Sequence, residues 1–522
     1  MNMQILNRTD AKRKEILILI LCLFIGFALR FYTFDRKSLW LDEIYTFNDS
    51  KDTIKDQLAF YKKNASYLQA PLFFTLTHLF YPFTKPERDL RVIPLIFGIL
   101  SIPMIYFLSR SFSPNIALPC TISLSFMTYH ICLSQDGRSY SLLMFLGMGA
   151  LYFLIKYLTT LKKGYLIGSG ILFAASFYTS YSAIPFIVLS QILWFYRRKE
   201  ENRNSCFFPF LILNGSVILL CLPWILFLAI NYDAPSMIDP VEAKFQISFL
   251  NIINGILHDW LPHLPLMIAS VILLFLFPFL TKRRRNAVVL LLVLILPAVG
   301  LYLFCKLFNI THFVTSKYFI NFLPLFFITI YLSIDALEVR FKRLKGLMRF
   351  RLLFTILFIA SNLTILPLYY RSEKQDFRGL VNYLKAHLRN GDRIFDEYRS
   401  HSLGLLHYLG IKPEGRFYHF PFYSISENEI EFRKSFIYRD QLYTIYSSRF
   451  CCGQYTADGS RLWAIVGEKT AKEFMAKSLG VFKGYFDGSF LNFNKFPTNA
   501  SMYLFLWDPS NPKSEGMKMP IE

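Results

Sequence analysis

The chain has 522 residues, of which 54% are apolar and only 18% are charged, against about 25% charged residues in ordinary soluble domains. This composition excludes a soluble globular protein, because several runs of about 18 or more residues carry almost no charge. The 57 lysines and arginines exceed the 36 acidic residues by 57 − 36 = 21, yet no nucleic-acid-binding module is visible. We therefore expect membrane lipids, and no nucleic acid, as partners.

The apolar runs predict an α-helical polytopic membrane bundle of about eleven crossings, since one crossing takes about 20 apolar residues. The boundary between the fifth and sixth runs is the weakest. The expected crossings have cores near residues 16–34, 90–109, 114–131, 139–158, 164–180, 182–196, 207–230, 262–281, 286–305, 318–337 and 352–370.

The basic clusters fall after every second crossing, beginning with residues 12–14, so the positive-inside rule places the N-terminus in the cytoplasm. An odd number of crossings then puts the C-terminus outside. Merging the fifth and sixth crossings would put every later cluster on the wrong side. These further clusters are residues 162–163, 197–199, 282–285 and 340–351.

Two adjacent carboxylates, Asp42 and Glu43, follow a few residues after the first apolar run. Read as a helix, this stretch places Trp40, Ile44 and Phe47 on one face and Asp42, Tyr45 and Asp49 on another. An interfacial helix would turn such a ring-bearing face towards lipid or the bundle, and its carboxylates towards a water-filled cavity. The alternative is a solvated acidic turn that caps a helix.

The chain is expected to divide near residue 370 into a transmembrane domain, 1–370, and an extracytoplasmic α/β domain, 371–522. The first outer loop of the transmembrane domain covers residues 35–89. Its apolar run 72–83 is too short to cross and is broken by Pro82, so we expect it to re-enter or to lie in the interface.

Helical spacing predicts a helix from Asp376 to Arg389, ended by residues 390–392, where Gly391 accepts a left-handed cap. A second helix is expected from about Lys469 to Leu479. Two continuous apolar runs read as buried strands, residues 461–467 and 502–507.

Three short motifs together resemble a known family. They are Arg30 followed by SLWLDE (38–43), then QAPLFF (69–74), then SQDGRSY (134–140) in a loop on the same outer side. In this combination the chain resembles the C-type membrane glycosyltransferases, the family of protein O-mannosyltransferases and the lipid A aminoarabinose transferase. One departure is Asp136, where relatives usually carry Glu.

The resemblance implies inverting transfer of a hexose or pentose from a polyprenyl-phosphate donor to a glycolipid, polymer or protein outside the cytoplasm. It further implies a multi-pass protein of a bacterial inner (plasma) membrane. Asp42 would act as the base, since a carboxylate can take a proton from an acceptor hydroxyl, and Glu43 would orient the acceptor or Asp42. Arg138 and Lys317 would hold the donor phosphate, because fixed cations stabilise its developing charge. Further candidate substrate-binding residues are Arg30, Asp136, Tyr140 and Tyr318.

Several of these residues have plainer interpretations. Asp136 and Arg138 can pair with each other, Lys317 with Tyr318 can be an interfacial anchor, and Arg30 can pair with Asp42 or Glu43. No cofactor is expected with certainty. A divalent metal stays open because three side chains with ligand chemistry lie close in sequence: His258, Asp259 and His263.

The rival function is a transporter or flippase of lipid-linked saccharides. Transporters place ionisable groups near the bilayer midplane, whereas the informative charges here cluster at one outer face. An inactive bundle that supports a scaffolding C-terminal domain is a third alternative.

Overall fold

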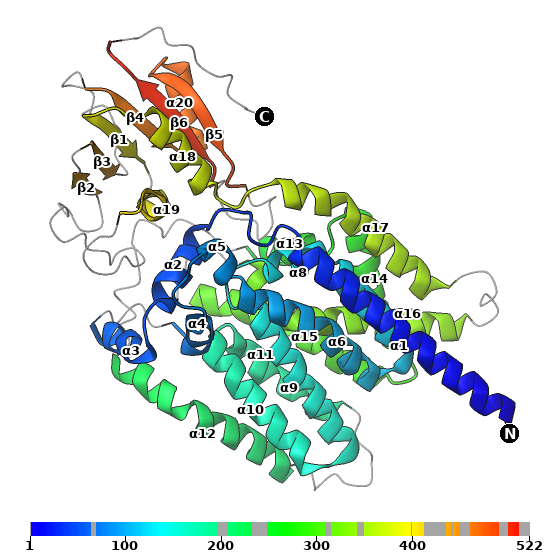
Figure 1. Ribbon diagram of the computed structural model, residues 1–522. Helices are drawn as coiled ribbons and strands as arrows, with labels where there is room; N and C mark the ends of the chain where they lie inside the picture. The colour runs from blue at the N-terminus through cyan, green and yellow to red at the C-terminus, as the bar shows by residue number, and fades with distance from the viewer. Residues whose placement is uncertain are drawn as a thin grey trace.

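The computed structural model describes residues 2–63, 69–196, 207–231, 248–307, 315–341, 349–397, 399–411, 435–439, 442–448, 460–489 and 500–510. The basic cluster 197–199 and most of the cluster 340–351 lie outside these residues. Figure 1 shows a bundle of helices with a small sheet at one end, and the N-terminus lies towards the opposite end of the bundle.

The bundle is built from apolar helices of very different lengths. Its helices are α1 (Asn2–Phe31), α6 (Val92–Phe112), α7 (Ala117–Phe126), α8 (Thr128–Ser134), α9 (Tyr140–Thr160), α10 (Lys163–Thr179), α11 (Ala183–Ser190), α12 (Phe207–Asn231), α13 (Phe249–Trp260), α14 (Leu264–Leu280), α15 (Arg284–Leu307), α16 (Leu323–Arg340) and α17 (Phe350–Arg371). The described part of the chain also has 3₁₀ turns next to three of these helices. η1 (Pro114–Ile116) precedes α7, η2 (Gln191–Phe195) follows α11, and η6 (Ser316–Phe322) precedes α16.

Within the described ranges, six helical segments are long and apolar enough to cross a membrane, or up to eight if two bent pairs each form one span. The expected eleven crossings are therefore not confirmed. The run expected at 114–131 is a pair of helices bent by 62°. The run expected at 182–196 is α11 followed by a 3₁₀ turn, and at 1.5 Å per residue α11 is too short to cross.

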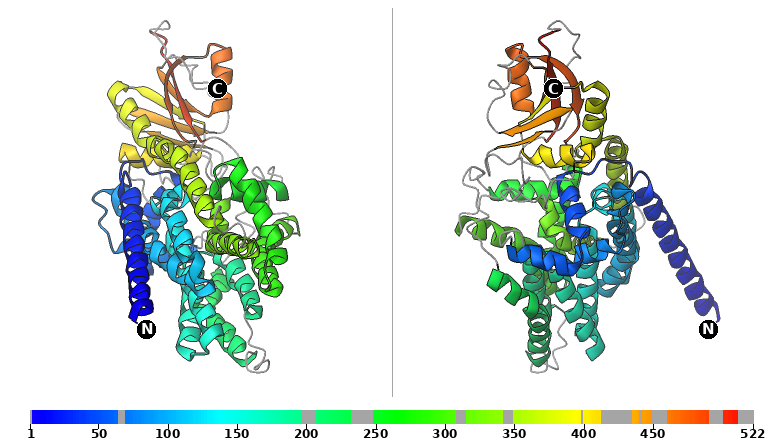
Figure 2. Two further views of the ribbon diagram at one scale, coloured as in Figure 1. Left: turned by 90° about the vertical axis from the view of Figure 1, so that its right-hand side faces the viewer. Right: turned by 60° about the vertical axis from the view of Figure 1, so that its left-hand side comes forward.

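Four short helices between α1 and α6 lie at the end of the bundle that carries the sheet (Figure 2). They are α2 (Leu41–Ser50), α3 (Ile54–Lys63), α4 (Pro71–His78) and α5 (Pro86–Asp89). The apolar run 72–83 begins as α4, which buries Phe73 and Phe74 and contacts α2, α6 and α10. This run therefore packs against the helices of the bundle.

The C-terminal sheet has six strands in the order β2-β3-β1-β4-β6-β5. β1 runs parallel to β3 and β4, and the other neighbouring strands are antiparallel. The strands are β1 (Asp392–Asp396), β2 (Ser435–Arg439), β3 (Tyr443–Ser448), β4 (Leu462–Val466), β5 (Val481–Phe486) and β6 (Met502–Trp507).

Helices cover both faces of the sheet, and alternate side chains of its strands pack against them on opposite sides. Trp463 and Ile465 of β4 pack with α18 (Phe377–His387) and α19 (Arg399–Leu409). Leu462 and Ala464 pack with α20 (Glu468–Ala476) on the other face. The α/β domain therefore has helices on each side of a mixed sheet.

The predicted C-terminal helices and strands lie within three residues of α18, α20, β4 and β6. Asp376 caps α18 by accepting a hydrogen bond from Gly379 N at 2.8 Å. The predicted end of α18 was wrong, because the helix stops at His387. Gly391, with φ +85°, instead forms the left-handed turn before β1.

The apolar face of α2 packs against the C-terminal domain. Ile44 and Tyr45 share one buried cluster with Phe377 and Leu380 of α18, and the Phe47 ring lies 4.9 Å from that of His407 in α19. The interpretation that this face turns towards lipid or the bundle was therefore wrong. The helix begins at Leu41, so Trp40 precedes it. The Trp40 indole N–H donates a hydrogen bond to Asp136.

Candidate active site

Asp42 lies in the first turn of α2 and faces two cations. Its Oδ2 is 3.5 Å from Lys317 Nζ and 3.8 Å from Arg138 Nε, and its side chain is 25% exposed. Arg138 also donates hydrogen bonds to Asp42 O and to Thr46 Oγ1, both at 3.2 Å. The loop before α9 is thereby fastened to α2, and a partly accessible carboxylate lies beside two positive charges.

Lys317 lies against two aromatic rings. It belongs to η6, where its side chain is only 5% exposed. Its ammonium lies 5.0 Å from the centre of the Trp40 ring and 5.4 Å from that of Tyr140. A cation over aromatic faces is stabilised by the ring quadrupole, so this lysine keeps its charge near Asp42 with little freedom to move.

Glu43, next to Asp42, is fully buried and makes a bidentate pair with Arg91. The two Arg91–Glu43 bonds, from Nε and Nη2, are each 2.7 Å long. Glu43 also accepts hydrogen bonds from Gly137 N at 2.7 Å and from Trp40 N at 3.3 Å. Every lone-pair direction of a carboxylate is served by such a set, so Glu43 joins α2 to two other segments.

The pKa of Glu43 reflects this environment. Burial by itself raises the pKa of Glu43, but the Arg91 guanidinium and the Lys374 ammonium outweigh burial and hold it well below its ordinary value. Glu43 is therefore ionised at neutral pH and is a poor proton acceptor. Of the two adjacent carboxylates, Asp42 is the one that a substrate can reach.

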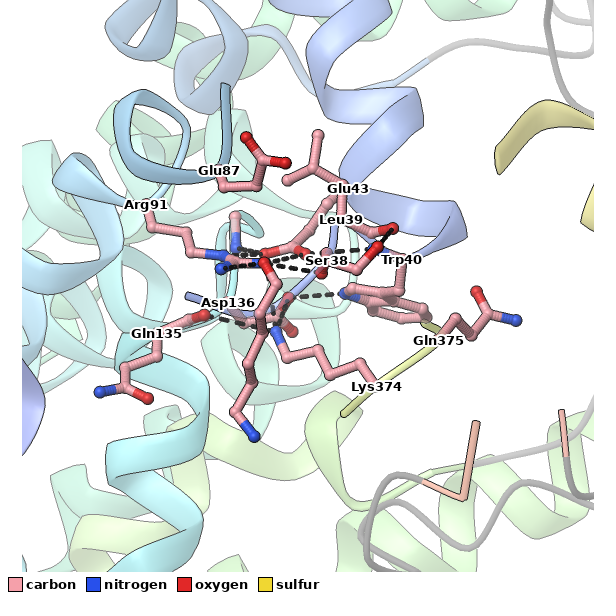
Figure 3. Close-up of polar contacts among 12 residues, drawn as sticks. Ser38, Leu39, Trp40, Glu43, Glu87, Arg91, Gln135, Asp136, Lys374 and Gln375 are labelled. Carbon is pink, nitrogen blue, oxygen red and sulfur yellow. Dashed lines mark hydrogen bonds and ion pairs between the residues drawn. The ribbon is translucent and has the colours of Figure 1, made fainter. Parts of the chain in front are cut away.

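Asp136 differs from Asp42 in its surroundings: it accepts hydrogen bonds from an indole and from an ammonium group. Its Oδ1 accepts hydrogen bonds from Trp40 Nε1 at 2.8 Å and from Lys374 Nζ at 2.9 Å (Figure 3). Burial lowers the pKa of Lys374, but Asp136 and Glu43 outweigh burial and raise it. Asp136 is thus paired with Lys374, whereas the plainer interpretation paired it with Arg138.

The charges of this network do not cancel. Three carboxylates, Asp42, Glu43 and Asp136, face four cations, so one positive charge remains among these seven side chains. Asp42 lies beside two of these cations, Arg138 and Lys317. The four cations are Arg91, Arg138, Lys317 and Lys374.

The other predicted substrate-binding residues divide into two groups. Tyr140 is buried under Lys317, and Tyr318 is half-buried in η6, close enough to Lys317 and Asp42 for their charges to act on it. Arg30 lies elsewhere: it is fully buried and donates to Leu124 O at 2.8 Å, with His130 Nδ1 at 2.7 Å. The structure therefore does not place Arg30 beside Asp42 or Glu43.

The three side chains considered as metal ligands make hydrogen bonds with the protein instead. His258 Nδ1 lies 3.2 Å from Asp259 Oδ1, Asp259 accepts a hydrogen bond from Ser316, and His263 Nε2 lies 2.9 Å from Thr364 Oγ1. Among the described residues no group of three or more His, Cys, Asp or Glu side chains is arranged to hold a metal ion.

Sequence reasoning missed Arg91 and Lys374. Arg91 stands at the start of an apolar run, where an arginine commonly reaches the membrane surface, so nothing local marked it as the partner of Glu43. Lys374 had no local signal either, because it lies 238 residues from Asp136 in an ordinary polar stretch. The sequence pattern predicted Trp40 only as a ring on a helix face. In the structure its indole N–H binds Asp136 and so connects it to the site.

Comparisons with known proteins agree with this architecture. The model of a family described as dolichyl-phosphate-mannose-protein mannosyltransferase matches residues 69–227, which include Asp136 and Arg138 but not Asp42. A comparison of the sequence with curated proteins finds no match.

Among solved structures, the chain is similar to ArnT from Cupriavidus metallidurans in the apo state. The two are 11% identical with a TM-score of 0.51, and the match covers 98% of this chain and 100% of that one. ArnT bound to undecaprenyl phosphate is also 11% identical, with a TM-score of 0.49 and the same coverage. At this identity the likeness shows a shared fold. The helical segments that are long and apolar enough to cross a membrane indicate an integral membrane protein. The predicted resemblance to the C-type membrane glycosyltransferases, the family of the protein O-mannosyltransferases and the lipid A aminoarabinose transferase, is thereby confirmed.

Proposed function

We propose that the chain transfers a sugar from a polyprenyl-phosphate donor to an acceptor hydroxyl on the non-cytoplasmic side of the membrane. The observation that carries this proposal is the partly exposed Asp42 carboxylate between Arg138 and Lys317. A base and two fixed cations are what displacement of a phosphate by a hydroxyl requires. The match to a mannosyltransferase family and the fold shared with ArnT support the same reaction class.

In this reaction Asp42 accepts the proton of the acceptor hydroxyl while its oxygen attacks the anomeric carbon of the sugar. The bond from that carbon to the phosphate oxygen breaks, and the polyprenyl phosphate leaves with the electron pair. A single displacement of this kind inverts the anomeric centre. Arg138 and Lys317 stabilise the leaving phosphate, Arg138 through a fork suited to two phosphate oxygens.

The transporter alternative has less support. The charged network gathers around α2, at the end of the bundle beneath the C-terminal sheet, and a carrier would place its ionisable groups near the midplane. An arrangement at one end of the bundle suits chemistry at a membrane surface.

Mass spectrometry of envelope glycolipids and glycoproteins, from cells with and without the chain, tests the proposal. We expect at least one glycosylated species to disappear when the chain is absent. With envelope glycolipids and glycoproteins from cells without the chain supplied as acceptors, the purified protein should also release undecaprenyl phosphate from one member of a panel of undecaprenyl-phosphate hexoses and pentoses. Identical profiles, with no release from the panel, would overturn the proposal.

A further inference from the structure

The short segment between α17 and α18 reaches back to the loop before α2 and to the first residue of that helix. Glu373 Oε2 accepts a hydrogen bond from Ser38 N at 3.1 Å, and Gln375 Oε1 accepts one from Leu41 N at 2.9 Å. The first N–H groups of a helix have no partner within the helix. The segment that begins the C-terminal domain therefore supplies a cap for α2, although it lies more than 300 residues away in sequence.

Lys374, between these two residues, is buried and makes three contacts with the site. Its Nζ donates to Asp136 Oδ1 at 2.9 Å and to Gln135 O at 3.3 Å, and it lies 3.5 Å from Glu43 Oε1 (Figure 3). The three acceptors come from two separate parts of the chain, α2 and the loop before α9. Lys374 thus holds these two parts together.

The contact with Asp136 extends to Asp42 through Trp40. The same Oδ1 atom that binds Lys374 also accepts the Trp40 indole N–H, and Trp40 immediately precedes α2. The face of the Trp40 ring in turn supports the Lys317 ammonium, which pairs with Asp42. A shift of Lys374 would therefore move both the start of α2 and the surface on which Lys317 rests.

The C-terminal domain adds further contacts to the same loop. Tyr408 of α19 accepts a hydrogen bond from Leu39 N at 2.7 Å and donates one to Glu87 at 2.9 Å. Ser38 Oγ accepts one from Arg378 N at 3.2 Å. The loop before Asp42 is thus bonded to both the linking segment and α19.

We propose that Lys374 is a positioning residue, which fixes Asp42 and Lys317 in place through Asp136 and Trp40 and so makes the C-terminal domain part of the active site. The expected effect on turnover rests on the proposed function, whereas the expected effect on the position of residues 38–46 does not. Lys374 does not touch the donor in this account. Its loss should lower turnover more than it weakens binding of the carrier lipid.

The test compares Lys374→Met with the parent in purified full-length protein, and Lys472→Met serves as the matched control. Lys472 is an exposed lysine of α20 that pairs with Glu468, far along the same domain. Gln375→Ala is a second variant, which removes the acceptor of Leu41 N without leaving a buried charge unpaired. Three quantities are measured: amide hydrogen exchange, affinity for undecaprenyl phosphate, and kcat with the donor that the parent uses.

For Lys374→Met we expect faster exchange confined to residues 38–46, unchanged exchange in β4 and β6, and an affinity for undecaprenyl phosphate within about threefold of the parent. The value of kcat should fall by roughly 10- to 100-fold, the size of effect that a misplacement of about 1 Å can have. Gln375→Ala should act in the same direction but less strongly, and Lys472→Met should match the parent.

Unchanged exchange at residues 38–46, in Lys374→Met or in Gln375→Ala if the first variant does not fold, would overturn the inference. So would exchange that is raised equally throughout the sheet with kcat unchanged, because that result marks a purely structural lysine. If the parent uses no donor in the panel, the proposed function fails, and the exchange measurement still decides the positioning role.

Discussion

Asp42 and Glu43 are neighbours in sequence with opposite surroundings. Glu43 is fully buried and bound by Arg91 at two points, while a quarter of the Asp42 side chain is exposed. Helical geometry separates adjacent side chains by about 100°, so one of the pair turns inwards and the other towards the open side. The sequence shows the pair, and only the structure distinguishes the structural acid from the accessible one.

Glu43→Gln should destabilise the protein. The substitution leaves the buried Arg91 without its counter-charge, and breaking a buried pair in this way costs about 3–5 kcal/mol. We expect a lower thermal midpoint in detergent-solubilised protein, while Glu468→Gln on the exposed face of α20 should melt like the parent. Equal midpoints for Glu43→Gln and the parent would show that the pair contributes nothing to folding.

Arg138→Lys should weaken binding of undecaprenyl phosphate by about tenfold, a loss of about 1.4 kcal/mol, because lysine keeps the charge but loses the bidentate fork. Isothermal titration of the purified variants measures this loss. The charge-swapped double variant Asp136→Arg/Arg138→Asp should not recover affinity, since the structure pairs Asp136 with Lys374 and Arg138 with Asp42. Recovery by the swap would mean that Arg138 serves Asp136 and not the carrier.

At the scale of elements, the Arg91–Glu43 pair fastens α2 to the start of α6 and makes that contact sensitive to acid. The folded-state pKa of Glu43 lies below its unfolded value, which is about 4.3. The resulting stability is present above that value and is lost as the pH falls towards the folded-state pKa.

The parent should therefore lose more stability between pH 5 and pH 3 than the double variant Glu43→Gln/Arg91→Met, in which both charges are absent. Thermal unfolding across this pH range measures the difference. Parallel pH profiles for the two proteins would contradict the assigned role of Glu43.

Elements with strong local signals could be predicted from the sequence. The helix α18 has apolar residues at helical spacing, and β4 and β6 are continuous apolar runs, so each was placed within about two or three residues. β1, β2, β3 and β5 were missed because they are short and mix polar with apolar side chains. The start of α2 was misplaced because Trp40 fits the helical pattern, although its backbone is extended, with φ −91° and ψ 172°.

The candidate site was predictable in part, for a similar reason. Asp42, Arg138 and Lys317 could be named from motifs and from their places at the outer ends of apolar runs, and the structure brings them together. The partners Arg91 and Lys374 could not, because a contact between segments far apart in sequence leaves no local pattern. Arg30 was placed in the site by its motif alone, and the fold buries it against other helices.

At the scale of the whole molecule, the N-terminus and the C-terminal sheet lie towards opposite ends of the bundle (Figure 1). The positive-inside rule predicts that the basic residues 12–14 lie in the cytoplasm, and we therefore expect the sheet on the opposite side of the membrane. A cysteine at Lys472 should then react with a membrane-impermeant thiol reagent in spheroplasts, and one at Lys12 only after lysis, in a background without other accessible cysteines. The reverse order of labelling would invert the topology and place Asp42 on the cytoplasmic side.

The central claim is that Asp42 takes the proton of the acceptor, and single-turnover transfer by purified Asp42→Asn tests it most directly. Asparagine is nearly isosteric and still accepts a hydrogen bond, so folding and binding of undecaprenyl phosphate should remain near those of the parent. It cannot take a proton, so transfer from the sugar donor should slow by roughly 10²–10⁴-fold. A variant that folds, binds the carrier and transfers sugar within a few-fold of the parent would show that Asp42 is not the base.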